Sequence, residues 1–446
     1  MSNSLDVKVN IASILKYSFP SVILMVCVSS YTMIDGMFIS RFIGSTALAA
    51  TNIVWPFINM IFGFSVMFSI GGGALCAIKI GEGKAKEAKE LFSYIALLSI
   101  VVILIYSALS LVFLDPILDF LGSNEHTDKY AYEYITICLV CAVITNCQVI
   151  LQHFLLTSAK VRQSMVGSFI GGGVNIVLDY VLLGLFDCSI WGAAVATVSG
   201  ALISSIYMLY HFKKSNNAIL NFVKPKAKFK EIIHAIINGS SEFVTSSAQG
   251  VTIFLFNITL LAMIGEVGVS AITALLYAQF FFSAAFLGFS NAISPVIGFN
   301  YGADNRANLV KVIRNSQIIV LVSSLVIFIG SMLTNKAVAS LFAGNNKELT
   351  YLIVSGGLIF NFQYLFCGFN IFTSSMFTAY SNGKISAVIS FSRTFLFITI
   401  CILALPQIIG ITGIWLAVPV AETLSIVLSI YYVIKYRNRY HYWTKK

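Results

Sequence analysis

Long apolar segments, separated by short polar connections, run through almost all of the 446 residues. Each segment holds at least about 20 residues, the length that an α-helix needs to cross about 30 Å of hydrocarbon. Charged residues make up only 10% of the chain and hydrophobic residues 58%, whereas a soluble domain carries roughly 25% charged residues. The sequence therefore predicts an all-α polytopic membrane protein.

The apolar segments predict twelve transmembrane helices. Transmembrane strands would instead need alternating segments of about ten residues, and the sequence contains no such series. The predicted spans are 11–39, 48–79, 91–114, 130–156, 163–186, 190–212, 231–263, 270–300, 310–333, 350–380, 385–408 and 411–436.

The basic residues predict how the chain lies in the membrane. Of the 28 Lys and Arg residues, only Arg41, Lys129, Lys336 and Lys347 fall in the odd-numbered connections. By the positive-inside rule, both termini and the lysine-rich connection 213–230 are expected in the cytoplasm, with the helices in a bacterial-type plasma membrane. The net charge of +10 therefore reflects topology. No nucleic-acid module accompanies it, so we expect no nucleic-acid partner.

Several kinds of chemistry have no matching pattern in the sequence. The eight cysteines lie almost entirely in apolar segments, and the CxxC of Cys138 and Cys141 has no second pair, so we expect packing rather than zinc or redox chemistry. Neither HExxH nor GxSxG occurs, which argues against an intramembrane enzyme. We expect no catalytic residues and no cofactor.

The chain also contains an internal duplication. The stretch GEGKAKEAKE, from Gly81, aligns with GADNRANLVK, from Gly302, at a shift of 221 residues, and the same shift aligns Thr157 with Thr378. Six spans per copy is an even number, so both copies enter the membrane in the same sense and should flank a central cleft. The predicted division is an N-terminal six-helix lobe 1–212, a basic cytoplasmic linker 213–230 and a C-terminal six-helix lobe 231–446.

Two acidic residues lie inside apolar spans of the first copy only. At the common shift, Asp35 aligns with Phe256, and Asp179 aligns with Ile400. An acid at the centre of a bilayer costs about 2.5–3.5 kcal/mol on insertion scales. The first lobe is therefore predicted to hold a polar, acidic pocket that the second lobe has replaced with apolar side chains.

The pocket has further oxygen-bearing candidates. Asn175 lies four residues before Asp179, on the same helix face, and Thr197 is in the following span. A buried carboxyl group can hold a proton, and several oxygen atoms together can hold Na⁺. The alternative is that these side chains only form hydrogen bonds between packed helices.

The second lobe carries a different set of polar residues. Arg393 and Glu422 lie near the middle of adjacent antiparallel spans, and we predict a structural ion pair between them. Gln249, Asn257 and Gln279 are candidate polar residues lining the cleft.

At this point the chain resembles the multidrug and toxic compound extrusion (MATE) family, within a larger superfamily that includes flippases. The resemblance rests on MIDGMFISRFIGSTALAA, NIVLDYVLLG, GAAVATVSG and YGADN, and it extends over nearly the whole chain. It implies two six-helix lobes arranged in a V, and export of drugs and other organic cations in exchange for H⁺ or Na⁺ by alternating access.

The resemblance also assigns roles to individual residues. It implies a cation site at Asp35, Asn175, Asp179 and Thr197, and a bending proline at Pro20. One branch of the family uses acids in the second lobe, but the matching positions here are Gln249 and Cys367, so that second ion site is expected to be missing.

The main alternative is a lipid-linked oligosaccharide flippase of the same superfamily. Such a protein would be expected to have a larger and more cationic cavity for a pyrophosphate group, whereas this first lobe offers acids. The expected partners are therefore small organic cations and drugs and the lipid bilayer, with the protein acting as a monomer.

Overall fold

The computed structural model describes residues 10–213, 219–344, 346–440 and 442. These residues form long helices joined by short turns, which confirms the predicted all-α class. Of the predicted linker 213–230, residues 214–218 lie outside the described residues. The division into two lobes at this linker stays a prediction. Below, the first half means α1–α8 and the second half means α9–α16.

The helices of the first half begin and end close to the predicted spans. They are α1 (Ile11–Phe42), α2 (Ser45–Gly81), α3 (Ala85–Val112), α4 (Leu114–Leu121), α5 (Asp128–Val140), α6 (Ala142–Thr157), α7 (Val161–Asp179), the π-helical turn η1 (Tyr180–Leu185) and α8 (Trp191–Lys213).

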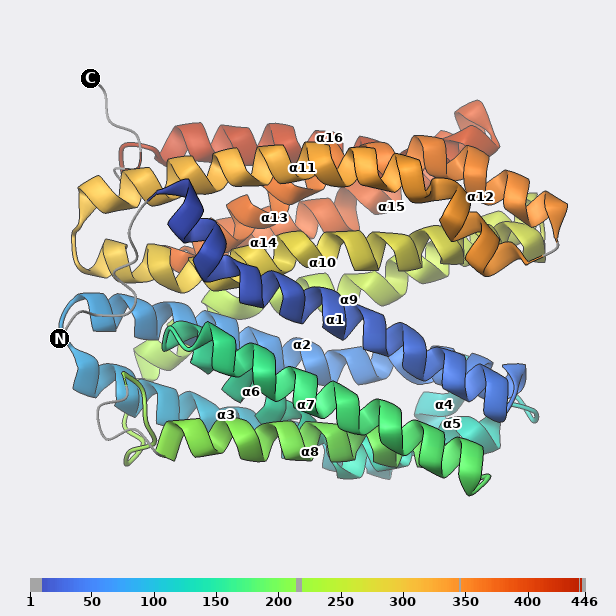
Figure 1. Ribbon diagram of the computed structural model, residues 1–446, viewed down its shortest axis with the longest axis horizontal. Coiled ribbons are helices and arrows are strands. Elements are labelled where there is room, and N and C mark those ends of the chain that lie inside the picture. The colour runs from blue at the N-terminus through green and yellow to red at the C-terminus, as the bar shows by residue number, and fades with distance from the viewer. Residues whose placement is uncertain (1–9, 214–218, 345, 441, 443–446) are drawn as a thin grey trace.

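The second half repeats the order of the six spans, although it has no counterpart of α4 and gains the elements η2 and α15. Its elements are α9 (Phe229–Met263), α10 (Glu266–Gly302), α11 (Arg306–Ala343), α12 (Lys347–Phe360), the 3₁₀ turn η2 (Asn361–Gln363), α13 (Tyr364–Ala379), α14 (Gly383–Phe391), the π-helical turn η3 (Ser392–Phe397), α15 (Ile398–Ile409) and α16 (Ile411–Tyr436). Figure 1 shows the two halves as neighbouring layers of roughly parallel rods, where α1 and α2 pack against α10 and α9.

Among the described residues, 11 helices are long and apolar enough to cross a membrane, and α5 and α6 together make up to 12. This confirms the predicted membrane class. The predicted span 130–156 is not straight, because α5 and α6 meet at a bend of 56°. The bend falls at Cys141, and the 3₁₀ turn η2 interrupts the corresponding span of the second half.

The turns between helices repeat as faithfully as the helices do. Every residue with positive φ in the described part of the chain has a counterpart in the other half, within two residues of the 221-residue shift. The pairs are Gly44 with Gly265, Gly83 with Asp304, Gly122 with Gly344, Ala159 with Ser381, and Asp187 with Gly410. The duplication is therefore a property of the backbone, including positions where the residue type has changed.

The buried apolar side chains show where the halves join. One cluster, here called the shared core, contains residues of both halves, such as Phe92 of α3 and Phe377 of α13. At the opposite end of the bundle each half has its own cluster, around Ile135 in the first half and Trp415 in the second. The halves are therefore fused at one end and packed separately at the other, as the arms of a V are.

The shared core lies toward the end of the bundle where α2, α6, α10 and α13 finish, here called the basic end (left in Figure 1). Backbones of the two halves touch there. At five glycines a Cβ atom would overlap the backbone of the opposite half: Gly71 and Gly81 in α2, Gly239 in α9, and Gly288 and Gly302 in α10. Larger side chains would hold the halves apart, so these glycines permit the contact.

An ion pair also crosses between the halves at the basic end. The Lys79 Nζ atom of α2 lies 2.9 Å from Glu231 Oε1 of α9 and 2.6 Å from Glu87 Oε2 of α3. Lys79 itself is largely covered, with 13% of its side chain exposed. The structure is thus closed at the basic end.

Candidate cation-binding site

Helix α7 positions two of the predicted site residues. Asn175 and Asp179 lie one turn apart on its inner face, with 4% and 0% of their surfaces exposed. Asp179 is the last residue of α7, and the π-helical turn η1 follows it directly. Single π-helical turns are rare and occur frequently at functional sites, because the extra residue redirects the side chains around it.

Helix α1 brings Asp35 to the same place. It packs against α7, and the half-buried Asp35 carboxyl group lies within hydrogen-bonding reach of Asp179 and Asn175. Residues 140 or more positions apart in the sequence therefore meet at one point inside the first half.

The oxygen atoms at this point lack donors. Both carboxylate oxygens of Asp179, Asp35 Oδ1 and Asn175 Oδ1 are buried and accept no hydrogen bond from the described part of the chain. Buried polar atoms are nearly always paired in folded proteins. Two facing carboxylates without a donor repel each other, and a shared proton or a bound cation removes that repulsion. The arrangement can therefore hold H⁺ or Na⁺.

Thr197 is connected to the site through Asn175. The Asn175 Nδ2 atom donates to Thr197 Oγ1 on α8 at 3.4 Å, a long and weak hydrogen bond. This bond occupies the amide nitrogen of Asn175 and leaves its carbonyl oxygen free. The geometry gives Thr197 a role in orienting Asn175.

Two aromatic residues near the site were not predicted. Tyr134 of α5 is 3% exposed and lies near enough to both acids to interact with them electrostatically. Tyr31 lies one turn before Asp35 on α1 and packs over Gly172 of α7. The four-residue spacing from Asp35 could have indicated Tyr31, whereas Tyr134 belongs to a distant segment that no pattern connects to the acids.

The second half holds a closed polar network on the corresponding helices. Arg393 Nη1 lies 3.1 Å from Glu422 Oε1, and Asn370 Nδ2 donates to Glu422 Oε2 at 2.7 Å. Ser429 Oγ in turn donates to Asn370 Oδ1 at 2.8 Å. The structure thus places Arg393 beside Glu422, and it adds Asn370, which no sequence pattern indicated.

The remaining predicted positions are spread along α9, α10 and α13. Gln249 is exposed, while Asn257 and Gln279 are partly buried and have amide oxygens without a donor. Cys367 is buried, at 2% exposure, in a cluster with Phe286.

Two further expectations concern the proline and the cysteines. Helix α1 runs unbroken through Pro20. All eight cysteines are free, and no group of three potential metal-ligating His, Cys, Asp or Glu residues occurs among the described residues.

Known proteins share this chain's sequence pattern and fold. The MatE family model matches residues 20–181 and 244–403, once in each half. The multidrug export protein MepA of Staphylococcus haemolyticus is 22% identical over 432 residues, covering 96% of this chain and 94% of the relative. The MepA protein of Staphylococcus saprophyticus is 22% identical over 423 residues, covering 92% and 90%.

Two solved structures illustrate the likeness in fold. One is the outward-facing conformation of a multidrug resistance MATE family transporter of the MOP superfamily, with a TM-score of 0.89, 21% identity and 96% coverage of both chains. Another is a MOP superfamily transporter from Pyrococcus furiosus, described as having a binding pocket of reversed polarity, with a TM-score of 0.85 and 21% identity over 96% of this chain and 95% of that chain. At these identities the structures show a common fold. Since the family model matches well over half of the residues, the chain belongs to the MatE family.

Proposed function

We propose that the protein is a secondary active multidrug efflux transporter, an antiporter that exports organic and often cationic compounds in exchange for H⁺ or Na⁺. The observation that carries this proposal is the pair of facing acids, Asp35 and Asp179, with buried oxygens that have no donor. Membership of the MatE family and the names of the staphylococcal relatives support the substrate class.

An antiporter needs a cation that binds one conformation better than the other, because equal affinity would couple nothing. Helix α1 can provide this link. It carries Asp35 toward one end, and toward the other its Ser21 and Val22 touch the backbone of α10 at Gly288, in the opposite half. Pro20 immediately precedes this contact and lacks the N–H that would complete the helical ladder. A hinge at Pro20 would let cation binding at Asp35 change the contact between the halves.

The order of steps in the proposed cycle depends on which side of the membrane the closed basic end faces. If the basic end faces the cytoplasm, as the distribution of Lys and Arg predicts, the structure is closed inward. A cation entering from outside then binds Asp35 and Asp179, and the closed form opens toward the cytoplasm after substrate has left. Both halves come from one chain, so a monomer contains the complete assembly.

Ethidium accumulation in cells tests the proposal. Cells that produce the protein should accumulate less dye than cells without it, and Asp35→Asn or Asp179→Asn should abolish the difference at equal protein levels. Asp119→Asn, at an exposed position of α4, is the matched control and should export normally. Separate imposition of a Na⁺ gradient and a proton gradient on membrane vesicles identifies the coupling ion.

Normal efflux by Asp35→Asn under both gradients would contradict the mechanism. If the unaltered protein exports no cationic dye, the flippase alternative would gain support. Movement of a lipid-linked saccharide in proteoliposomes would then be the measurement to make.

A further inference from the structure

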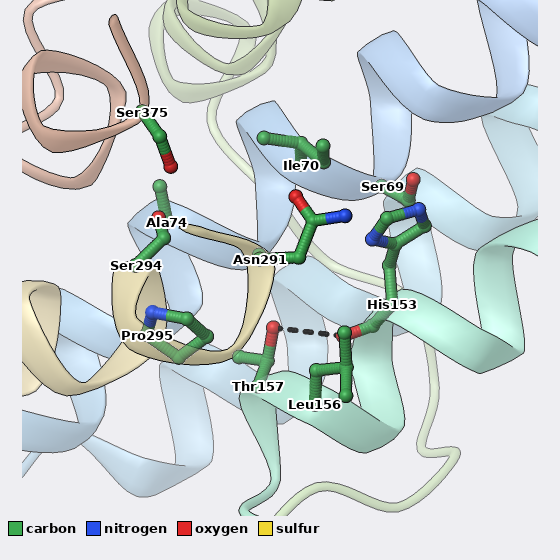
Figure 2. A pocket seen from close by; sticks show the side chains of 11 residues that line it. Ser69, Ile70, Ala74, His153, Leu156, Thr157, Asn291, Ser294, Pro295 and Ser375 are labelled. Carbon is green, nitrogen blue, oxygen red and sulfur yellow. Dashed lines mark hydrogen bonds between the residues drawn. The ribbon is translucent and has the colours of Figure 1, made fainter. Parts of the chain in front are cut away.

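A small polar cavity lies between the two halves, near the basic end and away from the two acids. Helices α2 and α6 of the first half and α10 and α13 of the second form its walls (Figure 2). Its polar lining consists of Ser69, His153, Thr157, Asn291, Ser294 and Ser375.

Equivalent positions of the two halves line the cavity. The α2 residues Ile70 and Gly73 line it on one side, and their equivalents at the 221-residue shift, Asn291 and Ser294 of α10, line it on the other. Matching positions thus face each other across the interface. The side chains differ, because α10 contributes a carboxamide and a hydroxyl where α2 contributes an apolar chain and a glycine.

Three of the lining side chains have unused hydrogen-bonding groups. The imidazole of His153, the carboxamide of Asn291 and the hydroxyl of Ser294 make no hydrogen bond within the described part of the chain, although His153 and Ser294 are each only 8% exposed. In Figure 2 the Asn291 amide points toward the His153 ring. Thr157 is already engaged, since its Oγ1 donates to the His153 carbonyl oxygen at 3.2 Å.

The cavity has room for about one water molecule. A buried water typically makes about three hydrogen bonds to groups that would otherwise be unpaired. No carboxylate lines the cavity, so its walls offer no negative charge to a cation. Its size and lining therefore suit water better than an ion or a drug.

We propose that this cavity is a water-binding site in which one water molecule joins His153 of the first half to Asn291 and Ser294 of the second. The bridge exists only while α6 and α10 face each other, so it stabilises the form that is closed at the basic end. This inference rests on the proposed function only in that the protein exchanges between two conformations.

Cysteine labelling measures the closed form without requiring transport. Ala77 of α2 is fully buried, and a Cβ atom at Gly298 of α10 would lie 3.2 Å from its methyl group. Ala77→Cys, in a variant whose natural cysteines are replaced by alanine and which still exports ethidium, therefore reports separation of the halves. The probe is a membrane-impermeant maleimide applied to inside-out vesicles.

His153→Leu and Asn291→Leu should each raise the labelling rate about tenfold, because each removes one side of the bridge. The double variant should label no faster than either single variant, since both changes remove the same bridge. His153→Gln keeps a hydrogen-bonding group and should stay within about twofold of the parent. Ser294→Ala removes the third partner of the water and should also raise the labelling rate, whereas its matched control Ser324→Ala, at a buried and unpartnered hydroxyl on α11, should not change labelling.

Two results would overturn the proposal. One is labelling that is unchanged or that rises multiplicatively in the double variant. The other is a changed KM for ethidium, which has amino groups, together with an unchanged KM for tetraphenylphosphonium, which has none, because the walls would then contact substrate. Equal changes for both compounds support the water bridge. Normal export by Asp35→Asn with these labelling differences intact would contradict only the proposed antiport, whereas loss of export in Asp35→Asn with unchanged labelling would contradict only the water site.

Discussion

The fifth and sixth spans of the two halves share a fold, but their buried carboxylates differ in whether they have partners within the chain. In the first half, Asp179 and Asn175 leave buried acceptor oxygens without donors. In the second half, one carboxylate oxygen of Glu422 accepts a hydrogen bond from Arg393, and the other accepts one from Asn370. Arg393 thus supplies, as a fixed part of the chain, the positive charge that a mobile cation would supply in the first half under the proposed function.

The π-helical turns show how one scaffold serves both purposes. In the first half η1 starts immediately after Asp179, and in the second half η3 contains Arg393. Both interruptions are in the fifth span of their half and adjoin a charged residue. The comparison teaches that an interrupted helix accommodates a charged residue. The neighbouring side chains then determine whether the buried carboxylate is paired within the chain.

The largest difference between the halves should appear on removal of an acid from the first half. Asp179→Asn is expected to reduce ethidium efflux to the level of cells without the protein, while the midpoint of thermal unfolding in detergent stays the same or rises, because an unpaired buried carboxylate contributes no stability. A clear fall in that midpoint would show that Asp179 is part of the packing, and the comparison would fail.

Removal of the acid in the second half should have the opposite effect. Glu422→Ala leaves the Arg393 guanidinium uncompensated and is expected to lower the free energy of unfolding by about 3–5 kcal/mol. The charge-exchanged variant with Arg393→Glu and Glu422→Arg should recover part of the loss. Protein yield and thermal unfolding measure this effect. If the exchanged pair recovers nothing, the pairing does not stabilise the half.

A smaller effect is expected at the amide that completes the network. Asn370→Leu removes hydrogen bonds to the Glu422 carboxylate and carbonyl oxygen, at 2.7 and 3.0 Å, and should cost about 1.5–3 kcal/mol of unfolding free energy. Asn257→Leu, at an amide whose oxygen has no donor, is the control and should be nearly neutral. Equal losses in both variants would mean that amide burial, rather than the network, determines the cost.

The smallest effect is expected at Thr197. Its bond from Asn175 is long, at 3.4 Å, so Thr197→Val should change the unfolding free energy by less than about 1 kcal/mol. The loss of orientation at Asn175 should weaken the dependence of efflux on the coupling cation by a few-fold at most, and Thr197→Ser should behave as the parent does. Abolished efflux in Thr197→Val would place its hydroxyl group directly on the cation.

The sequence predicts the fold well because each span must satisfy its own backbone hydrogen bonds in lipid, which makes long apolar segments decisive. It also singles out Asp35 and Asp179, since a charge in an apolar span stands out in one dimension. The interruption at Cys141 was missed because no proline or glycine lies at that point. The one after Asp179 contains Gly184, but this glycine lies so close to the predicted end of its span, at 186, that it did not indicate a break. Tyr134 and Asn370 were missed because their importance depends on contacts between helices that are far apart in the sequence. The spacing of residues along the chain does not indicate such contacts.

The glycine contacts at the basic end have a consequence for inherited variation. Gly71, Gly81, Gly239 and Gly302 let two backbones touch, and one added methyl group at any of them would keep the halves apart on that side. Under the proposed alternating-access cycle, a chain with such a change would be confined to one conformation although Asp35, Asp179 and the other proposed site residues remained unaltered. A search for the cause of lost export that is restricted to the proposed substrate pocket would overlook these variants. Gly→Ala at these glycines should therefore be included in such a search.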